Sequence, residues 1–391
     1  MKVRVASENL VLAVKALGAS KAPKHATCFD WVHVRNWMDC SSQLHLTLTR
    51  TDLAWFAGVT IPCDVVEGAP RIEGDVESII GLRFLKDVIK QCPKGSGDVT
   101  LLSGAQGTSI ATFGGALFAE PFLAKAEDFP QAPVVGDGIS SSPIPSAELA
   151  RAIEDVSFAM AQDICREQLQ KVYLISDHGR LFAVASDGKR IAESYVCRYD
   201  DARGELNIAL PDTLLPSLVR LLKLAKVDVA LDVDEKTIAL ADVEEGFAVV
   251  CSRPNMPCAL PDYRSLIPAA LACFPEGFQC HAGALVAAIK TAMTGHDRNA
   301  PCPIQITFRP GDALAEVKGA STARLDATLF GARDSFLWSA AFAGEFAESR
   351  GKKELITFRT GAAGVKAVVA FGESNVRYAF MPVIPKTEEK E

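Results

Sequence analysis

Two groups of charged side chains in this sequence have the residue types and spacing that acid–base catalysis would need. In the Asp-Gly-Lys-Arg segment at 187–190, Asp187 could act as a general base beside two cations. Asp163 and Glu167 would share one face of a helix as a carboxylate pair. A glycine turn with solvated charges is a simpler explanation of the first group, and a solvated helix face of the second. We favour these structural explanations over catalysis.

Other motifs of catalysis or metal binding are missing from the sequence. There is no Gly-x-x-x-x-Gly-Lys-Ser/Thr phosphate loop, no Gly-x-Ser-x-Gly elbow and no His-Glu-x-x-His pair. The 11 cysteines include no Cys-x-x-Cys, and the 6 histidines do not cluster at ligand spacing. Scattered cysteines are typical of free thiols in a reducing compartment. We therefore expect a protein that is not an enzyme and binds no metal or cofactor.

The elements that would position these residues recur along the chain about every 130 residues, which indicates three related units. Helix starts are predicted at 7–10, 146–149 and 281–285. A second helix is predicted in each unit, at 81–91, 211–226 and, with the weakest pattern, 335–350. Short alternating strands fill the remainder, so each unit has an α+β organisation. A repeated ligand-binding or scaffold protein could have the same pattern.

Composition narrows the class of protein further. Of 391 residues, 49% are hydrophobic and 23% are charged, which is typical of a globular protein. No apolar run reaches about 18 residues and the first residues lack an apolar signal core, so we expect a cytoplasmic protein without a membrane span. The net charge of −7 does not exclude nucleic acid, because the position of the positive charges decides binding.

One block of the second unit resembles a known family. Phe-Ala-Met-Ala-Gln-Asp at 158–163 and Val-Ala-Ser-Asp-Gly-Lys-Arg-Ile at 184–191 are similar to the bacterial DNA polymerase III β subunit, the sliding clamp. That family usually has Thr, His and Leu where this chain has Ser186, Lys189 and Ile191. Shorter matches lie at 48–53, 127–130, 260–264 and 378–383. The third unit matches least.

The resemblance implies an α+β fold of three structurally similar DNA-clamp domains, each with two helices packed on antiparallel sheets. Their expected bounds are 1–132, 143–264 and 265–391. Two chains would join head to tail into a six-domain ring around duplex DNA, near the nucleoid, without sequence preference. The ring would tether the DNA polymerase III catalytic subunit, the clamp loader and other proteins with a clamp-binding motif. The alternative is a divergent homologue with a mobile-element or repair role, which does not serve the main replicase.

The resemblance also implies three functional surfaces. The partner-peptide pocket would comprise Leu169, Ser186, Gly188, Lys189, Arg190, Ile191, Pro261, Leu266, Ala379, Phe380, Met381 and Pro382. The DNA-facing residues would be Lys15, Lys21, Lys24, Arg83, Lys86, Lys90, Arg151, Arg166, Arg220, Lys223, Lys226, Lys290 and Arg298. The dimer interface would include Leu117, Phe118, Phe122 and Met293. Ordinary core packing would equally explain the last group, and solvated helix faces would explain many of the cations.

Overall fold

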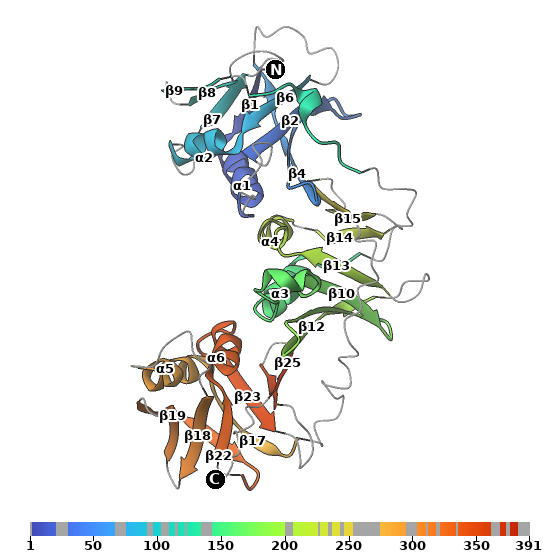
Figure 1. The fold of residues 1–391 in the computed structure, drawn as a ribbon. Helices are drawn as coiled ribbons and strands as arrows, with labels where there is room; N and C mark the ends of the chain where they lie inside the picture. Colours follow the sequence, from blue (N-terminus) through green and yellow to red (C-terminus); the bar gives the residue numbers. More distant parts are fainter. Residues whose placement is uncertain are drawn as a thin grey trace. The chain divides into compact units, whose positions relative to one another are not determined.

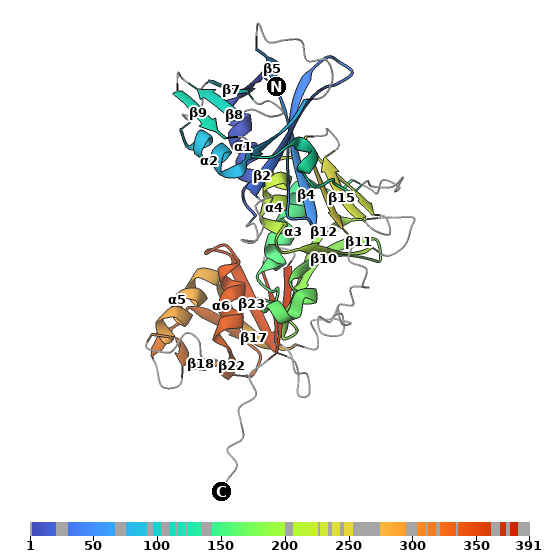
Figure 2. The same cartoon turned by 45° about the horizontal axis from the view of Figure 1, so that its top comes forward.

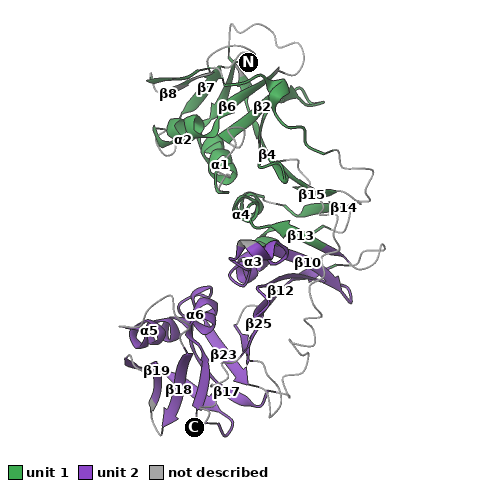
Figure 3. Cartoon of the chain, viewed as in Figure 1, with its two compact units in different colours: residues 1–150, 199–204, 208–257 green, residues 151–198, 205–207, 258–391 purple. Residues whose placement is uncertain are grey.

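The computed structural model (Figures 1 and 2) describes most of the chain as two compact units. The described residues are 2–20, 30–66, 76–91, 97–102, 109–113, 116–121, 123–133, 143–199, 206–225, 227–233, 237–242, 246–252, 274–294, 303–309, 312–317, 321–333, 335–360, 368–372 and 376–381. Unit 1 is formed by residues 1–150, 199–204 and 208–257, and unit 2 by residues 151–198, 205–207 and 258–391 (Figure 3). The three predicted domain boundaries stay a prediction.

Unit 1 contains antiparallel sheets covered by helices. One sheet has the order β14 (Val229–Val233), β15 (Thr237–Asp242), β16 (Phe247–Ser252), β4 (Trp55–Pro62), β3 (Leu44–Thr51), β2 (Trp31–Met38), β6 (Val76–Gly81). The other has the order β5 (Asp64–Val65), β1 (Lys2–Ala6), β7 (Asp98–Leu102), β8 (Ser109–Phe113), β9 (Ala116–Glu120). The remaining elements are β13 (Asn207–Pro211), the short 3-10 helix η2 (Ala126–Asp128) and the helices α1 (Ser7–Leu17), α2 (Leu82–Gln91) and α4 (Leu215–Leu224).

Unit 2 has the same kind of construction. Its larger sheet runs β10 (Lys171–Asp177), β11 (Arg180–Ser186), β12 (Arg190–Arg198), β25 (Val376–Phe380), β24 (Val368–Phe371), β23 (Leu355–Thr360), β17 (Glu276–His281), β21 (Ala327–Phe330). Its smaller sheet runs β20 (Thr322–Arg324), β19 (Asp312–Val317), β18 (Pro303–Arg309), β22 (Ser335–Ser339). The helical elements are most of α3 (Ser146–Ser157), the 3-10 helix η3 (Ile164–Leu169), α5 (Ala282–Ala292) and α6 (Ala340–Glu348).

Amphipathic patterns explain why these segments become helices. In α2 the apolar side chains of Leu82, Leu85 and Val88 are buried on one face, which leaves Arg83 and Lys90 exposed. The predicted helix over 211–226 is confirmed in shorter form as α4, with Pro216 in its first turn, where a proline fits because no helical hydrogen bond is lost.

The predicted helix over 335–350 is wrong in its first part. Residues 335–339 (Ser-Phe-Leu-Trp-Ser) alternate between half-buried and buried positions and form β22. Only Ala340–Glu348 is helical, and the Ser339 hydroxyl caps it by accepting from the Phe342 N–H at 3.4 Å.

An aromatic core holds the strands and α6 of unit 2 together. The centre of the Phe278 ring lies 5.2 Å from that of Trp338 and 5.6 Å from that of Phe358. The Phe346 ring stacks on the Tyr378 ring with 5.1 Å between their centres. Burying each such side chain contributes about 1.5–3 kcal/mol. Because Phe346 lies on α6 and Tyr378 on β25, this core fixes α6 against the strand that carries part of the predicted pocket.

None of the helices in the described part of the chain has the length and apolar character that crossing a membrane requires.

Candidate functional site

The Asp-Gly-Lys-Arg segment forms a tight turn between β11 and β12. One carboxylate oxygen of Asp187, Oδ1, accepts from the backbone N–H groups of Lys189 at 2.8 Å and Arg190 at 3.0 Å. The Ser186 hydroxyl donates to the Arg190 carbonyl at 2.7 Å and accepts from the Gly188 N–H at 3.1 Å. Gly188 has φ of +84°, a conformation that favours glycine. The Asp187 carboxylate therefore holds the predicted glycine turn. The expectation of solvated charges is correct for Lys189, which is exposed, and wrong for Arg190, which is buried.

β25 places the C-terminal residues of the predicted pocket beside this turn. Ile191 pairs with Ala379 and Arg190 with Phe380, and the Met381 N–H donates to the Lys189 carbonyl at 3.1 Å. Met381 is 56% exposed, although Ala379 and Phe380 are buried. Residues that are far apart in sequence therefore lie side by side here, and the large apolar side chain of Met381 faces solvent.

The short helix η3 supplies the other side of the turn. A Cβ atom on Gly188 would lie 3.6 Å from Leu169 Cδ1 and 3.4 Å from Arg166 Nη1. The Arg166 guanidinium donates to the Asp187 carbonyl at 2.7 Å, so this residue, predicted to face DNA, lies against the 187–190 turn. Half-buried Leu169 is therefore close to the turn that also contacts Met381. Pro261, Leu266 and Pro382 lie outside the described residues.

The Asp163 and Glu167 pair belongs to η3 and not to an α-helix. Asp163 is its N-terminal cap, and its Oδ1 accepts from the Cys165 N–H at 3.0 Å. Both carboxylates are exposed, which agrees with a solvated role.

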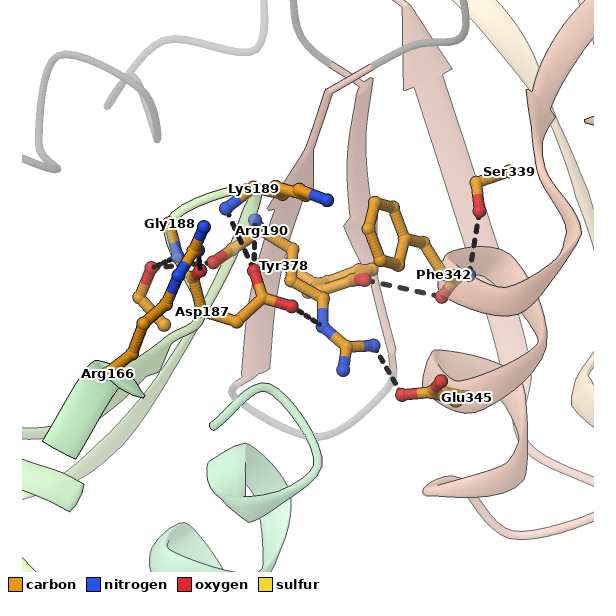
Figure 4. A network of polar contacts seen from close by, with 10 residues as sticks. Arg166, Asp187, Gly188, Lys189, Arg190, Ser339, Phe342, Glu345 and Tyr378 are labelled. Atoms are coloured by element: carbon orange, nitrogen blue, oxygen red, sulfur yellow. Dashed lines mark hydrogen bonds and ion pairs between the residues drawn. The ribbon is translucent and has the colours of Figure 1, made fainter. Parts of the chain in front are cut away.

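Arg190 connects the turn to α6 (Figure 4). Its side chain is 6% exposed, its Nε lies 3.0 Å from Asp187 Oδ2, and its Nη1 forms an ion pair with Glu345. The guanidinium also lies 5.0 Å from the centre of the Phe342 ring. Burial lowers the pKa of Arg190, but Tyr378, Glu345 and Asp187 together outweigh burial, so the pKa is raised.

A second buried ion pair joins α6 to α3. Arg350, just after α6, has a side chain that is 2% exposed, and its Nη1 lies 2.8 Å from Asp155 Oδ1. Arg151 Nη1 lies 2.8 Å from Asp155 Oδ2, and Arg151 also donates to the Tyr195 carbonyl at 3.0 Å. The guanidinium of Arg151, predicted to face DNA, is therefore engaged within unit 2.

The remaining described DNA-facing candidates lie on helices. Six are exposed: Lys15, Arg83, Lys90, Arg220, Lys223 and Lys290. Lys86 is half-buried and donates to the Gly18 carbonyl at 3.2 Å, and burial lowers its pKa. Unit 1 thus carries exposed cations on α1, α2 and α4, and Arg220 on α4 donates to the Lys15 carbonyl at 2.9 Å. Outside the described residues are Lys21, Lys24, Lys226 and Arg298.

Two of the four predicted dimer residues, Leu117 and Phe118, lie on the strand β9 of unit 1. Among the described strands, β9 pairs only with β8. Leu117 on β9 is 67% exposed, whereas Phe118 is half-buried. Met293 is half-buried at the C-terminal end of α5 in unit 2, and Phe122 lies outside the described residues. An edge strand with an exposed leucine is a ready template for strand pairing.

Glu345, Phe342, Asp155 and Arg350 were missed by the sequence reasoning. One signal was available: Glu345 is the only charged residue in the apolar run 340–347 of α6. A lone charge in an apolar helix needs a partner.

The comparisons with known proteins agree with this architecture. Residues 143–250 match the family model for the central domain of the DNA polymerase III β subunit. The chain is 28% identical over 244 residues to the β sliding clamp of Caulobacter vibrioides, a match that covers 61% of this chain and 63% of that relative. The chain thus spans less than two thirds of the relative's length.

Solved structures resemble the chain over nearly its whole length. The DNA polymerase III β subunit of Pseudomonas aeruginosa superposes with a TM-score of 0.78 and 19% identity, covering 98% of this chain and 100% of that one. The β subunit of Thermotoga maritima gives a TM-score of 0.79 and 15% identity, covering 98% and 99%. The predicted fold is confirmed: the chain has the fold of the solved DNA polymerase III β clamps, and its residues 143–250 match that family's central-domain model.

Proposed function

We propose that this chain is a non-catalytic sliding clamp, which encircles duplex DNA as a head-to-tail homodimer and tethers a DNA polymerase. The observation that carries the proposal is the clamp fold over 98% of the chain. A ring requires a head-to-tail contact that closes, because an open one would form filaments. The exposed edge of β9, with Leu117, is our candidate for one half of that contact.

The exposed lysines and arginines of α1, α2, α4 and α5 would face the DNA. Long cationic side chains attract phosphates at a distance and independently of sequence, which favours sliding over tight gripping. The whole chain has a net charge of −7, so the rest of the surface is more acidic than these helices. Such a clamp would work beside the chromosome in the bacterial cytoplasm.

The surface around the 187–190 turn would bind short peptides of partner proteins, among them the polymerase catalytic subunit and the clamp loader. Leu169 and Met381 offer apolar contacts for leucine or phenylalanine side chains, and a methionine adapts to several partners. The turn between them is fixed by the hydrogen bonds of Ser186 and Asp187, so the site is formed before the peptide arrives.

A single substitution tests this site. Met381→Asp should weaken binding of a fluorescent peptide from the C-terminal tail of a DNA polymerase III catalytic subunit, measured by anisotropy. Burial of a methionine is worth about 1.5–3 kcal/mol, so the loss should be roughly 10- to 150-fold. Met38→Asp is the matched control, because Met38 is also 56% exposed and lies on β2 in unit 1. Equal affinity of the two variants would contradict the proposed site.

A further inference from the structure

Glu345 is a charged residue on a helix that is otherwise apolar from Ala340 to Ala347. Its carboxylate turns toward Arg190 of β12 (Figure 4). Glu345 lies on α6, whereas the proposed pocket is built from η3, the 187–190 turn and the end of β25. It can therefore influence a bound peptide through Arg190.

The connection from Glu345 to the pocket has defined steps. Glu345 pairs with Arg190, and Arg190 Nε lies 3.0 Å from Asp187 Oδ2. The other oxygen of Asp187 holds the N–H groups of Lys189 and Arg190, at 2.8 and 3.0 Å. The Lys189 carbonyl then accepts from the Met381 N–H at 3.1 Å. Each step is a direct hydrogen bond or ion pair within unit 2.

The burial of Arg190 makes Glu345 important to this chain of contacts. A guanidinium that is 6% exposed needs full compensation by hydrogen bonds and charge. Without Glu345, Arg190 would keep Tyr378 and the Phe342 ring, and Asp187, which already holds the turn, would be the carboxylate that pairs with it. Competition for that carboxylate would loosen the turn and, through Lys189, the position of Met381.

We propose that Glu345 is a positioning residue for partner binding: through Arg190 it holds the 187–190 turn in the shape that a peptide recognises, so α6 controls the affinity of the pocket. This inference rests on the proposed function of the pocket. Changes in α6 would then change partner binding without any contact to the peptide. Couplings of this kind through one network typically change affinity by about 2- to 30-fold.

The test compares two glutamates of the same helix. Glu345→Ala should weaken binding of the polymerase tail peptide by about 2- to 30-fold. Glu345→Gln should reduce the affinity less, because an amide oxygen still accepts a hydrogen bond. Glu348→Gln is the matched control: Glu348 is 50% exposed and pairs with Lys290 of α5 at 2.8 Å. It should bind the peptide as the unmodified chain does.

Hydrogen exchange separates positioning from a general loss of stability. In the Glu345 variants, amides of 187–191 and 379–381 should exchange faster, and the peptide should restore their protection. Unchanged peptide affinity in both Glu345 variants, while the unmodified chain binds, would overturn the inference and leave the proposed function intact. An unmodified chain that binds no such peptide would overturn both.

Discussion

Replacing Arg350 with methionine should destabilise unit 2 strongly. Arg350 Nη1 lies 2.8 Å from Asp155 Oδ1, its Nη2 donates to the Asp155 carbonyl at 3.2 Å, and its guanidinium lies 5.8 Å from the centre of the Phe346 ring. The side chain is 2% exposed, so water cannot replace these contacts.

The magnitude follows from what remains around Asp155. Removing one partner of a buried ion pair costs about 3–5 kcal/mol, because the other charge stays buried. Here Arg151 still lies 2.8 Å from Asp155 Oδ2, and the Ser194 hydroxyl still donates to it at 3.0 Å. Because these two partners remain, we expect the free energy of unfolding of unit 2 to fall by about 3 kcal/mol, the lower end of that range.

Native-state hydrogen exchange measures this loss separately in each unit. A loss of about 3 kcal/mol should speed exchange of the most protected amides of unit 2 by more than about 100-fold and leave unit 1 unchanged. Arg377→Met is the control, because Arg377 is exposed on β25, and it should change stability by less than about 0.5 kcal/mol. If both variants exchange alike, the reasoning about the buried pair is refuted.

Three further predictions concern other parts of the molecule. Leu117→Lys should break the proposed strand-edge contact, so sedimentation should give a mass near 41.8 kDa in place of twice that value; an intact dimer would argue against this edge. Burial lowers the pKa of His33 below its ordinary 6.5 in spite of Glu77, so protons bind more readily to the unfolded chain. The stability of unit 1 should therefore fall as the pH falls through 6.5. Urea titrations of His33→Phe should show a weaker dependence of stability on pH. A pH profile that His33→Phe leaves unchanged would contradict this assignment. Arg83→Glu with Lys90→Glu should shorten residence on DNA and reduce its salt dependence in single-molecule measurements; unaltered residence would exclude α2 from the DNA-facing surface.

Local chemistry made part of this structure predictable from sequence. The 187–190 turn follows from a glycine flanked by Ser, Asp and charged residues, and the face of α2 follows from its 3.6-residue pattern. Over 335–339 the alternating burial pattern of β22 could not be separated from the helix that follows directly at Ala340.

The long-range pairs could not be predicted in the same way. Arg190 and Glu345 are 155 residues apart, and the Arg350 side chain reaches the Asp155 carbonyl across 195 residues. No spacing rule joins such positions, because only the packing of α6 against β12 and α3 brings the charges together. These pairs also explain why the resemblance could predict a pocket without naming the residues that support the 187–190 turn.

Retention on circular and linear DNA tests the central claim most directly. The protein is loaded onto nicked circular plasmid with a bacterial clamp loader and ATP, freed of unbound protein by gel filtration, and then treated with an enzyme that cuts the plasmid once. A ring held by topology should stay on the circle and run off the cut molecule. Equal retention on both forms would contradict encirclement.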